Sequence, residues 1–277
     1  MALLFLLFIP LASLLYRAHH NTKQVQLNHV QIDNDGESSL HLNVLQISDM
    51  HLENISVSAQ DIYEQLKDEP IDLIALTGDF LDRKRSIPKL IPYLKAFNKL
   101  NPKHGIYAVF GNHDYVLRKK NFTALQQILE AYHCKTLQNE SKTLEIDGHT
   151  IQLIGIDDHS TNRSDVEAAY QQVGSGYHFV LTHDPNVVLH MKGYRVDYLL
   201  AGHFHGGQIC YPKAYHLVKM GKLPRMDMVK GLQEYDGKRF YINEGLGQTG
   251  VNIRVGSRPE ITIHKLMIPS QTAASAG

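Results

Sequence analysis

The sequence predicts an α/β fold, and three observations lead to this prediction. Short runs rich in Val, Ile, Leu, Phe and Tyr recur along the chain and have the length of β-strands. Segments with helical spacing of apolar residues lie between several of them. Metal-binding residue types, chiefly Asp and His, follow these runs. Because ligands bind at the carboxyl ends of strands in open α/β sheets, we expect these residues to converge on one cleft.

Five apolar runs are predicted to be strands, and they cover residues 40–47, 71–76, 106–110, 179–181 and 196–201. Helical patterns occupy residues 55–66, 90–97, 122–131 and 164–172, the last opening with the capping-box sequence Ser164–Glu167. Residues 143–154 break the alternation, because apolar residues alternate on both sides of Asp147-Gly148, which indicates a hairpin. A mixed sheet, or two stacked sheets with outer helices, is therefore expected.

The chain is expected to form one large domain, residues 40–268. About 240 residues remain after an apolar leader, which is one domain by the usual size range. Residues 269–277 are predicted to be a disordered tail, since Gln271–Gly277 is small and polar. Cys134 and Cys210 are too few for a disulfide framework and lack the spacing of metal ligands, so both are expected to be ordinary thiols.

Residues 1–18 are predicted to be an apolar membrane anchor or a signal segment. Met1–Tyr16 carries no charge, and Arg17 and Lys23 follow it. The positive region that precedes the apolar part of a secretory signal is missing, which favours a retained anchor. The run contains Pro10 and is slightly shorter than the about 20 apolar residues of a spanning helix. Positive charges on its carboxyl side indicate the inner membrane, with the main domain facing the cytoplasm.

The charge is balanced overall but unevenly distributed. With 28 basic and 28 acidic residues the formal net charge is zero, so no general attraction to nucleic acid is expected. Two stretches, 83–103 and 213–230, combine Lys and Arg with apolar residues. Such stretches suit an anionic membrane surface, although a solvated helix face and an ordinary long loop are the alternatives. No obligate protein partner is predicted.

Five short clusters carry the chemistry. They are Asp49-Met50-His51, Gly78-Asp79-Phe80-Leu81-Asp82, Gly111-Asn112-His113-Asp114, Thr182-His183-Asp184 and Gly202-His203-Phe204-His205. A lone His at a strand end is usually structural, but five clusters that supply carboxylates, imidazoles and one amide indicate a two-metal site. This mixture of ligands suits Mn, Fe, Zn or Co better than Ca or Mg.

In this order the five clusters resemble the motifs of the calcineurin-like metallophosphoesterase superfamily, over about residues 40–266. The resemblance implies a four-layer α/β/β/α sandwich with two divalent metal ions at the carboxyl ends of the strands. It implies that Asp79 bridges both ions. The other implied ligands are Asp49, His51 and His205 for one ion and Asn112, His183 and His203 for the other.

The resemblance also implies roles for residues beside the ligands. His113 would protonate the leaving oxygen or stabilise the charged phosphoryl group, and Asp82 would orient it. Asp114 would position the loop. Arg83 is expected either to contact phosphate or to form a surface ion pair. Phe204, between the last two His, departs from the small or polar residue of related chains, but its side chain should point away from the metals.

The segment 243–260 and Gly206-Gly207-Gln208 resemble a membrane-associated bacterial branch of the superfamily. That branch includes enzymes that cleave UDP-2,3-diacylglucosamine in lipid A biosynthesis, and Arg254 and Arg258 would be substrate contacts. A metal-bridging hydroxide would then hydrolyse a phosphodiester or pyrophosphate bond.

Three alternative functions remain. The first is a phosphodiesterase of phospholipids, nucleotides or cell-wall polymers. The second is a phosphoprotein phosphatase, which the leader and the basic apolar stretches disfavour. The third is a non-catalytic scaffold, which predicts degraded ligands, although every expected ligand is present. The expected substrate is therefore a phosphorylated small molecule or a lipid-linked one at a membrane surface.

Overall fold

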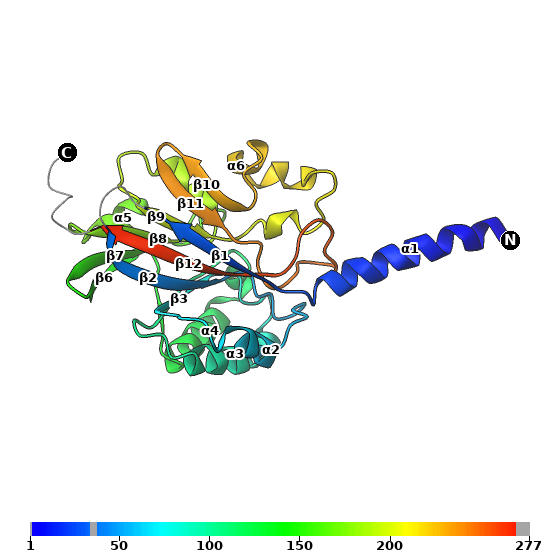
Figure 1. Ribbon diagram of the computed structural model, residues 1–277, viewed down its shortest axis with the longest axis horizontal. Helices are drawn as coiled ribbons and strands as arrows, with labels where there is room; N and C mark the ends of the chain where they lie inside the picture. Colours follow the sequence, from blue (N-terminus) through cyan, green and yellow to red (C-terminus); the bar gives the residue numbers. More distant parts are fainter. Residues whose placement is uncertain (1, 34–37, 270–277) are drawn as a thin grey trace.

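Two six-stranded sheets form the centre of the molecule (Figure 1). The computed structural model describes residues 2–33 and 38–269, with the backbone alone at residues 2–11 and 38–39. The first sheet has the order β1-β12-β2-β3-β4-β5, and its central β2 to β5 run parallel. Its strands are β1 (Gln26–Ile32), β2 (Ser38–Ile47), β3 (Leu73–Thr77), β4 (Ile106–Val109), β5 (Cys134–Thr136) and β12 (Glu260–Pro269).

The second sheet has the order β10-β11-β9-β8-β7-β6. Its four inner strands are parallel, and an antiparallel hairpin closes each side. The strands are β6 (Glu140–Ile146), β7 (His149–Gly155), β8 (Tyr177–Leu181), β9 (Tyr198–Ala201), β10 (Gly231–Tyr235) and β11 (Lys238–Ile242).

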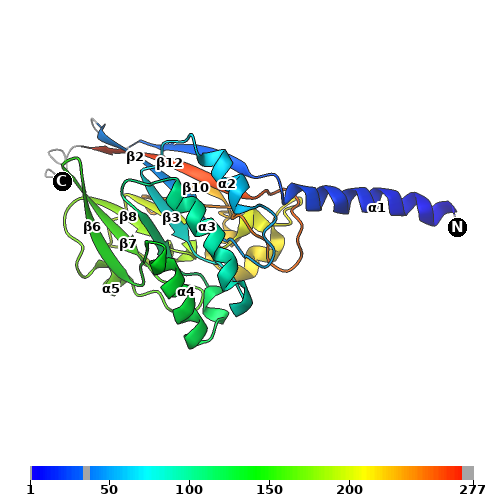
Figure 2. The ribbon, with the colours of Figure 1, turned by 90° about the horizontal axis from the view of Figure 1, so that it is seen from below.

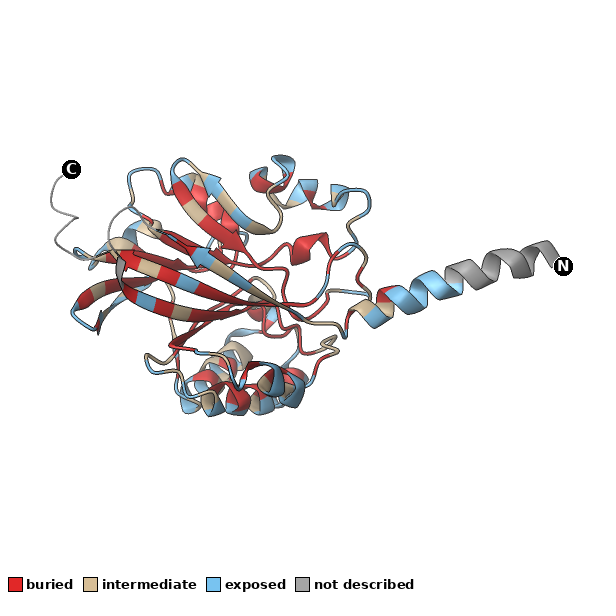
Figure 3. Cartoon of the chain, in the orientation of Figure 1, coloured by how far each residue is buried: buried red, intermediate tan, exposed pale blue. Residues whose placement is uncertain are grey.

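Three groups of buried apolar residues define four layers. One lies between the sheets and joins residues such as Leu42 of β2 to Phe179 of β8. The second packs the first sheet against α2 (Ala59–Leu66), α3 (Ile87–Lys99) and α4 (Lys119–Ala131), as Figure 2 shows. The third packs the second sheet against α5 (Val166–Tyr170), η3 (Pro185–His190), η5 (Tyr215–Met220) and α6 (Lys222–Arg225). The predicted α/β/β/α sandwich is confirmed, and Figure 3 shows its buried strands between partly exposed helices.

Most predicted elements are present with shifted ends. The hairpin around Asp147-Gly148 is β6 and β7. The helix expected at Ser164 instead has Asp165 as its N-cap, because the Asp165 carboxylate accepts the Ala168 N–H. The predicted domain start at residue 40 leaves out β1, which pairs with β12 in the first sheet. Pro269, assigned to the tail, ends β12, and the rest of the predicted tail lies outside the described residues.

The predicted leader falls in α1 (Ala2–Asn21), which projects away from the sandwich (Figure 1). Among the described residues, no helix combines the length and the apolar character needed to cross a membrane. The carboxyl end of α1 is fastened to the loop before β12, since the Arg254 N–H donates to the Ala18 carbonyl at 2.8 Å and the His19 ring contacts the Asn252 carbonyl. Cys134 and Cys210 are free thiols, as expected.

Candidate functional site

The five clusters meet at the carboxyl ends of five strands. Asp49 and His51 follow β2, and Asp79 follows β3, while the next cluster follows β4. From the second sheet, His183 follows β8, and the pair His203 and His205 follows β9. The parallel direction of these strands brings residues from both sheets to one edge of the sandwich. Six of the seven predicted metal ligands are buried, and Asn112 is partly buried.

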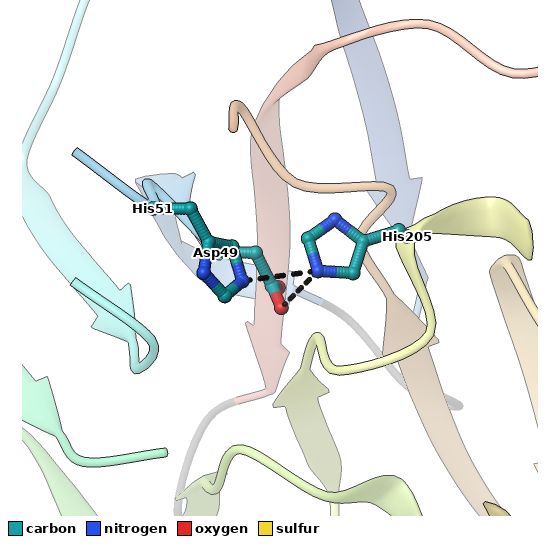
Figure 4. Close-up of side chains that lie close together, drawn as sticks. All are labelled: Asp49, His51 and His205. Carbon is teal, nitrogen blue, oxygen red and sulfur yellow. Dashed lines mark hydrogen bonds and ion pairs between the residues drawn. The ribbon is translucent and has the colours of Figure 1, made fainter. Parts of the chain in front are cut away.

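The first group of side chains is Asp49, His51 and His205 (Figure 4). His205 Nε2 lies 3.1 Å from His51 Nε2 and 3.3 Å from Asp49 Oδ1. Two ring nitrogens and a carboxylate oxygen therefore point at one small volume. This is the arrangement in which three lone pairs can share a cation.

The second group is Asp79, His183 and His203. His183 Nε2 lies 3.1 Å from His203 Nδ1 and 3.1 Å from Asp79 Oδ2. Asp79 Oδ2 also lies 3.5 Å from His51 Nε2 of the first group. The Asp79 carboxylate thus stands between the two groups, which is where a bridging ligand has to be.

Asn112 supplies an independent test of the metal hypothesis. Its Oδ1 atom is buried and has no hydrogen-bond partner among the described residues. Such an orphaned acceptor is rare in folded proteins and calls for an unseen partner. An amide oxygen is a suitable ligand for a divalent ion, so this atom fits the predicted coordination.

The protonation of the histidines follows the same geometry. Burial lowers the pKa of His205 to about 3, which keeps its imidazole neutral and able to bind a cation. Burial also acts to lower the pKa of His183, but the Asp79 carboxylate outweighs it and raises that pKa well above the usual value. A proton on His183 therefore neutralises Asp79 where a metal ion would do so, and metal binding should release it.

His113 stands beside these groups and is held by Asp82. The His113 Nδ1 atom lies 3.0 Å from Asp82 Oδ1, which also contacts His51 Nδ1 at 3.3 Å. Burial acts to lower the pKa of His113, but the hydrogen bond that its ring donates to Asp82, together with the Asp79 charge, outweighs this and raises that pKa to about 9. Asp82 thus orients two imidazoles with one oxygen, and His113 can carry a proton at neutral pH.

The ligand loops have an unusual backbone. Five of the seven predicted ligands adopt positive φ, a conformation that costs a non-glycine residue about 1–3 kcal/mol. They are Asp49, His51, Asp79, His203 and His205. The rest of the fold must offset this strain, which indicates that the side-chain positions matter more than local stability.

Two glycines are required by close approach to the carboxylates. A Cβ atom at Gly111 would collide with the Asp79 carboxylate, and one at Gly202 would collide with Ser48 and Asp49. The glycines that precede Asn112 and His203 in their clusters therefore make room for the acidic ligands of other strands. Any larger residue there would displace a ligand.

Asp114 stabilises the loops that follow β3 and β4. Its fully buried carboxylate accepts N–H groups from Asp79, Phe80 and Gly111, each at 2.9 Å. Burial, together with the nearby Asp79 charge, raises the pKa of Asp114 to about 8. All three contacts are to backbone N–H groups, so Asp114 acts through the residues it holds.

The predicted substrate contact at Arg254 is wrong. Its side chain is fully buried, and its guanidinium donates to the carbonyls of Glu244, Gly245 and Gly247 at 2.7 to 2.9 Å. These bonds hold the segment after β11 beside the predicted metal ligands. Arg83 and Arg258 are exposed.

Sequence reasoning missed two contacts that support the site. Glu53 accepts the N–H groups of Asp82 and Arg83, at 3.1 and 2.9 Å. Tyr115 donates to Asp157, which ties the loop after β4 to the loop after β7. The position of Glu53 two residues after His51 was a local signal, but the Tyr115–Asp157 pair had none. Phe204 is buried in the apolar cluster outside the second sheet, and it also lines the cavity at the predicted metal ligands.

Comparison with known proteins agrees with this geometry. The family model of the calcineurin-like phosphoesterases matches residues 42–207, which include all five clusters. The chain belongs to the calcineurin-like metallophosphoesterase family. It is therefore a metal-dependent hydrolase, and its grouped His and Asp side chains are those of a two-metal site.

Relatives within the family differ in how much is known of them. The uncharacterized metallophosphoesterase YkoQ of Bacillus subtilis is 58% identical over 268 residues, which cover 96% of this chain and 98% of that protein. The uncharacterized metallophosphoesterase YkuE of the same organism is 27% identical over 80% of this chain and 78% of its own. The UDP-2,3-diacylglucosamine pyrophosphatase LpxG of Chlamydia trachomatis is 25% identical and covers 82% of this chain and 84% of its own.

Proposed function

We propose that this protein is a membrane-associated dimetal phosphohydrolase that cleaves a phosphodiester or pyrophosphate bond. Asp49, His51 and His205 would hold one ion, and Asn112, His183 and His203 the other. Asp79 would contact both. The observation that carries this proposal is the position of Asp79 Oδ2, within 3.5 Å of a ring nitrogen from each group. We propose Mn, Fe, Zn or Co because the ligands mix imidazole with carboxylate.

The charges of the site favour a phosphoryl group. Two divalent ions bring four positive charges, and Asp49 and Asp79 return two negative ones, so the site stays electropositive. When bound, the ions would polarise phosphoryl oxygens and lower the pKa of an attacking water. The ligand side chains would fix the ions and leave one side of the site open to the substrate.

His113 is proposed to donate a proton to the leaving oxygen or to stabilise negative charge on the phosphoryl group. Its contact with Asp82 at 3.0 Å and its raised pKa, about 9, support a protonated ring in the resting site. Asp82 then fixes the ring so that the Nε2 side is free to face a substrate. Arg83 and Arg258, both exposed, remain proposed contacts for the outer part of the substrate.

A membrane is the proposed working surface. The side chains of Leu15 and Tyr16 at the end of α1 are exposed, as are Tyr211 and Tyr215 in the segment beside the site. Tyr211 is 84% exposed. Arg17 and Lys23 follow the apolar run, so we propose the cytoplasmic face of the inner membrane.

The finer proposal is hydrolysis of UDP-2,3-diacylglucosamine in lipid A biosynthesis. It is supported by relatives at 25% identity, the LpxG pyrophosphatases, and by the exposed apolar side chains near the site. The second candidate is a phosphodiesterase of phospholipids, nucleotides or cell-wall polymers. It is favoured because the relative at 58% identity is an uncharacterized metallophosphoesterase, which offers no support for a substrate of lipid A biosynthesis.

Substrate ranking tests both candidates. The purified protein, reconstituted with Mn²⁺, would be incubated with UDP-2,3-diacylglucosamine, with a phospholipid in vesicles and with bis(4-nitrophenyl) phosphate. Fastest turnover of the UDP lipid supports the lipid A proposal, and fastest turnover of either diester supports the second candidate. Absence of hydrolysis with all three substrates, at two bound metal ions per chain, would refute the proposed reaction.

A further inference from the structure

A second cavity opens beside the metal groups. The cavity at the metals has a volume of about 180 Å³ and is lined by Asp79, Asn112 and His113. The neighbouring cavity measures about 750 Å³, and its wall includes His159, Asp184, His190, Lys219 and Lys222. Both cavities are lined by His203 and Met220, so they meet at a predicted metal ligand.

The two cavities can hold different parts of one substrate. Sites for organic ligands usually measure about 300–1,000 Å³, so the smaller cavity has room for little more than the reacting phosphoryl group. A larger group attached to it has to extend elsewhere. The second cavity has the size of a complete ligand site and begins where the first one ends.

The cavity wall that carries Lys219 and Lys222 is held in place by the buried side-chain amide of Asn186. Asn186 is 5% exposed, and its side chain donates to the Asp184 carboxylate at 2.8 Å and to the Met220 carbonyl at 2.9 Å. The Leu223 N–H donates back to the same amide. A Cβ atom at Gly221 would collide with this amide. These contacts hold the backbone between Lys219 and Lys222 against η3.

The other cations of the same stretch already have partners. Lys213 pairs with Asp227 at 2.8 Å, and Lys230 pairs with Glu244 at 2.9 Å. Arg225 donates to the Val218 carbonyl at 3.0 Å. In the described part of the chain, Lys219 and Lys222 have no carboxylate partner, and both line the second cavity. The Lys222 ammonium also lies over the Tyr235 ring, 5.7 Å from its centre. Two cations without a carboxylate partner on a cavity wall favour an anionic occupant.

The remaining wall is polar as well. The rings of His159 and His190 lie 4.7 Å apart, and Asp184 uses one carboxylate oxygen for Asn186, so the other remains for a hydroxyl donor. We propose that this polar cavity binds the part of the substrate beyond the scissile phosphoryl group, and that this part carries a second phosphoryl group. The inference rests on the proposed function and narrows it to pyrophosphates or doubly phosphorylated substrates.

A matched pair of double variants tests the proposal. Lys219→Gln with Lys222→Gln removes the cavity cations, and Lys213→Gln with Arg225→Gln removes the same charge from cations that have partners. Uridine monophosphate and uridine diphosphate differ by one phosphoryl group, and calorimetry on the Mn²⁺-loaded protein gives the ratio of their affinities. We expect the diphosphate preference of the native protein to fall at least about tenfold in the cavity variant alone.

Several outcomes would overturn the proposal. An unchanged preference in the cavity variant does so, as does an equal fall in both variants, which would reflect the general surface charge. Vesicles with anionic lipid form a separate arm, and a cavity variant that loses vesicle binding but keeps its diphosphate preference would assign the lysines to the membrane. Hydrolysis of the three substrates named under the proposed function is measured alongside, because its absence with all three in the native protein refutes the proposed reaction and leaves the binding comparison intact.

Discussion

Two stretches of similar composition behave differently in the structure. Residues 83–103 and 213–230 both combine Lys and Arg with apolar side chains. In the first stretch, α3 buries Leu90, Leu94 and Phe97 against the first sheet and exposes its lysines. The second stretch follows the metal ligands and leaves Tyr215, Val218 and Met226 exposed.

The difference lies in the spacing of the apolar residues. In α3 they recur every three or four positions, so one face can be buried and the charges are left in solvent. In the second stretch Leu217 and Leu223 are buried, but Val218 and Met226 are exposed, so no single face is covered. Composition alone suggested a membrane surface for both stretches, and only the second keeps the exposed apolar groups that such a role requires. The first is an ordinary solvated helix face.

The second stretch can affect catalysis only if it borders an active metal site. The substitution Asp79→Ala is the strongest test of that site. The change removes the carboxylate that stands between the two groups of ligands, so activity on every substrate should fall to background while the fold survives. Metal content by elemental analysis and the circular dichroism spectrum check both parts. Wild-type turnover in this variant would show that the two-metal assignment is wrong.

Asp82, directly before the first stretch, contacts His113 beside the predicted metal ligands. His113→Ala should lower kcat by about 10²–10⁴, the usual worth of proton transfer by a positioned side chain. Metal occupancy should stay near two, because the ring is assigned to the reaction and not to coordination. If metal is lost in this variant, His113 is a ligand.

Stability separates the two stretches directly. Leu94 is fully buried, so Leu94→Ala should lower the free energy of unfolding by about 2–5 kcal/mol. Val218 is 42% exposed, and Val218→Ala should change the free energy of unfolding by less than about 0.5 kcal/mol. Urea unfolding measures both. Similar losses in the two variants would mean that the second stretch is packed as firmly as the helix.

The membrane role of the second stretch is tested by removing its charge. Neutralising Lys219, Lys222 and Arg225 to Gln should reduce hydrolysis of a lipid substrate in anionic vesicles at least about tenfold at low salt, since each cation near such a surface contributes about 1 kcal/mol. A soluble monophosphodiester should be unaffected.

The matched control for this triple variant replaces Lys95, Lys99 and Lys103 of the first stretch, where no loss on vesicles is expected. Losses of equal size in the two triple variants, or none in either, would remove the functional distinction between the stretches.

The predicted metal ligands could be found in the sequence because each lies in a local motif. A ligand such as Asp79 follows directly on a strand in a short motif, and parallel strands then bring such motifs together without further information. The alternation of strands and helices left a mixed sheet and two stacked sheets open, and the family resemblance implied the sandwich. β1 and β12 were not predicted, and they pair across more than 200 residues.

Other parts could not be predicted because they depend on packing. Whether Arg254 is exposed or buried is decided by the carbonyls that surround it, and those come from loops whose shape the sequence does not disclose. The left-handed backbone at Asp49 and His205 is likewise imposed by the whole fold against the local preference of these residues. The second cavity depends on the contact of Asn186 with Met220, 34 positions apart.

The position of β12 bears on synthesis of the chain. This last strand of the described residues lies between β1 and β2, which are among the first to be made. While the ribosome is translating the middle of the chain, β1 has no neighbour in its sheet and β2 has an open edge. Arg254, which fastens α1 and the loop after β11, also arrives late. The nascent protein therefore cannot complete its first sheet until β12 has been translated, and until then its unpaired strands depend on shielding from aggregation.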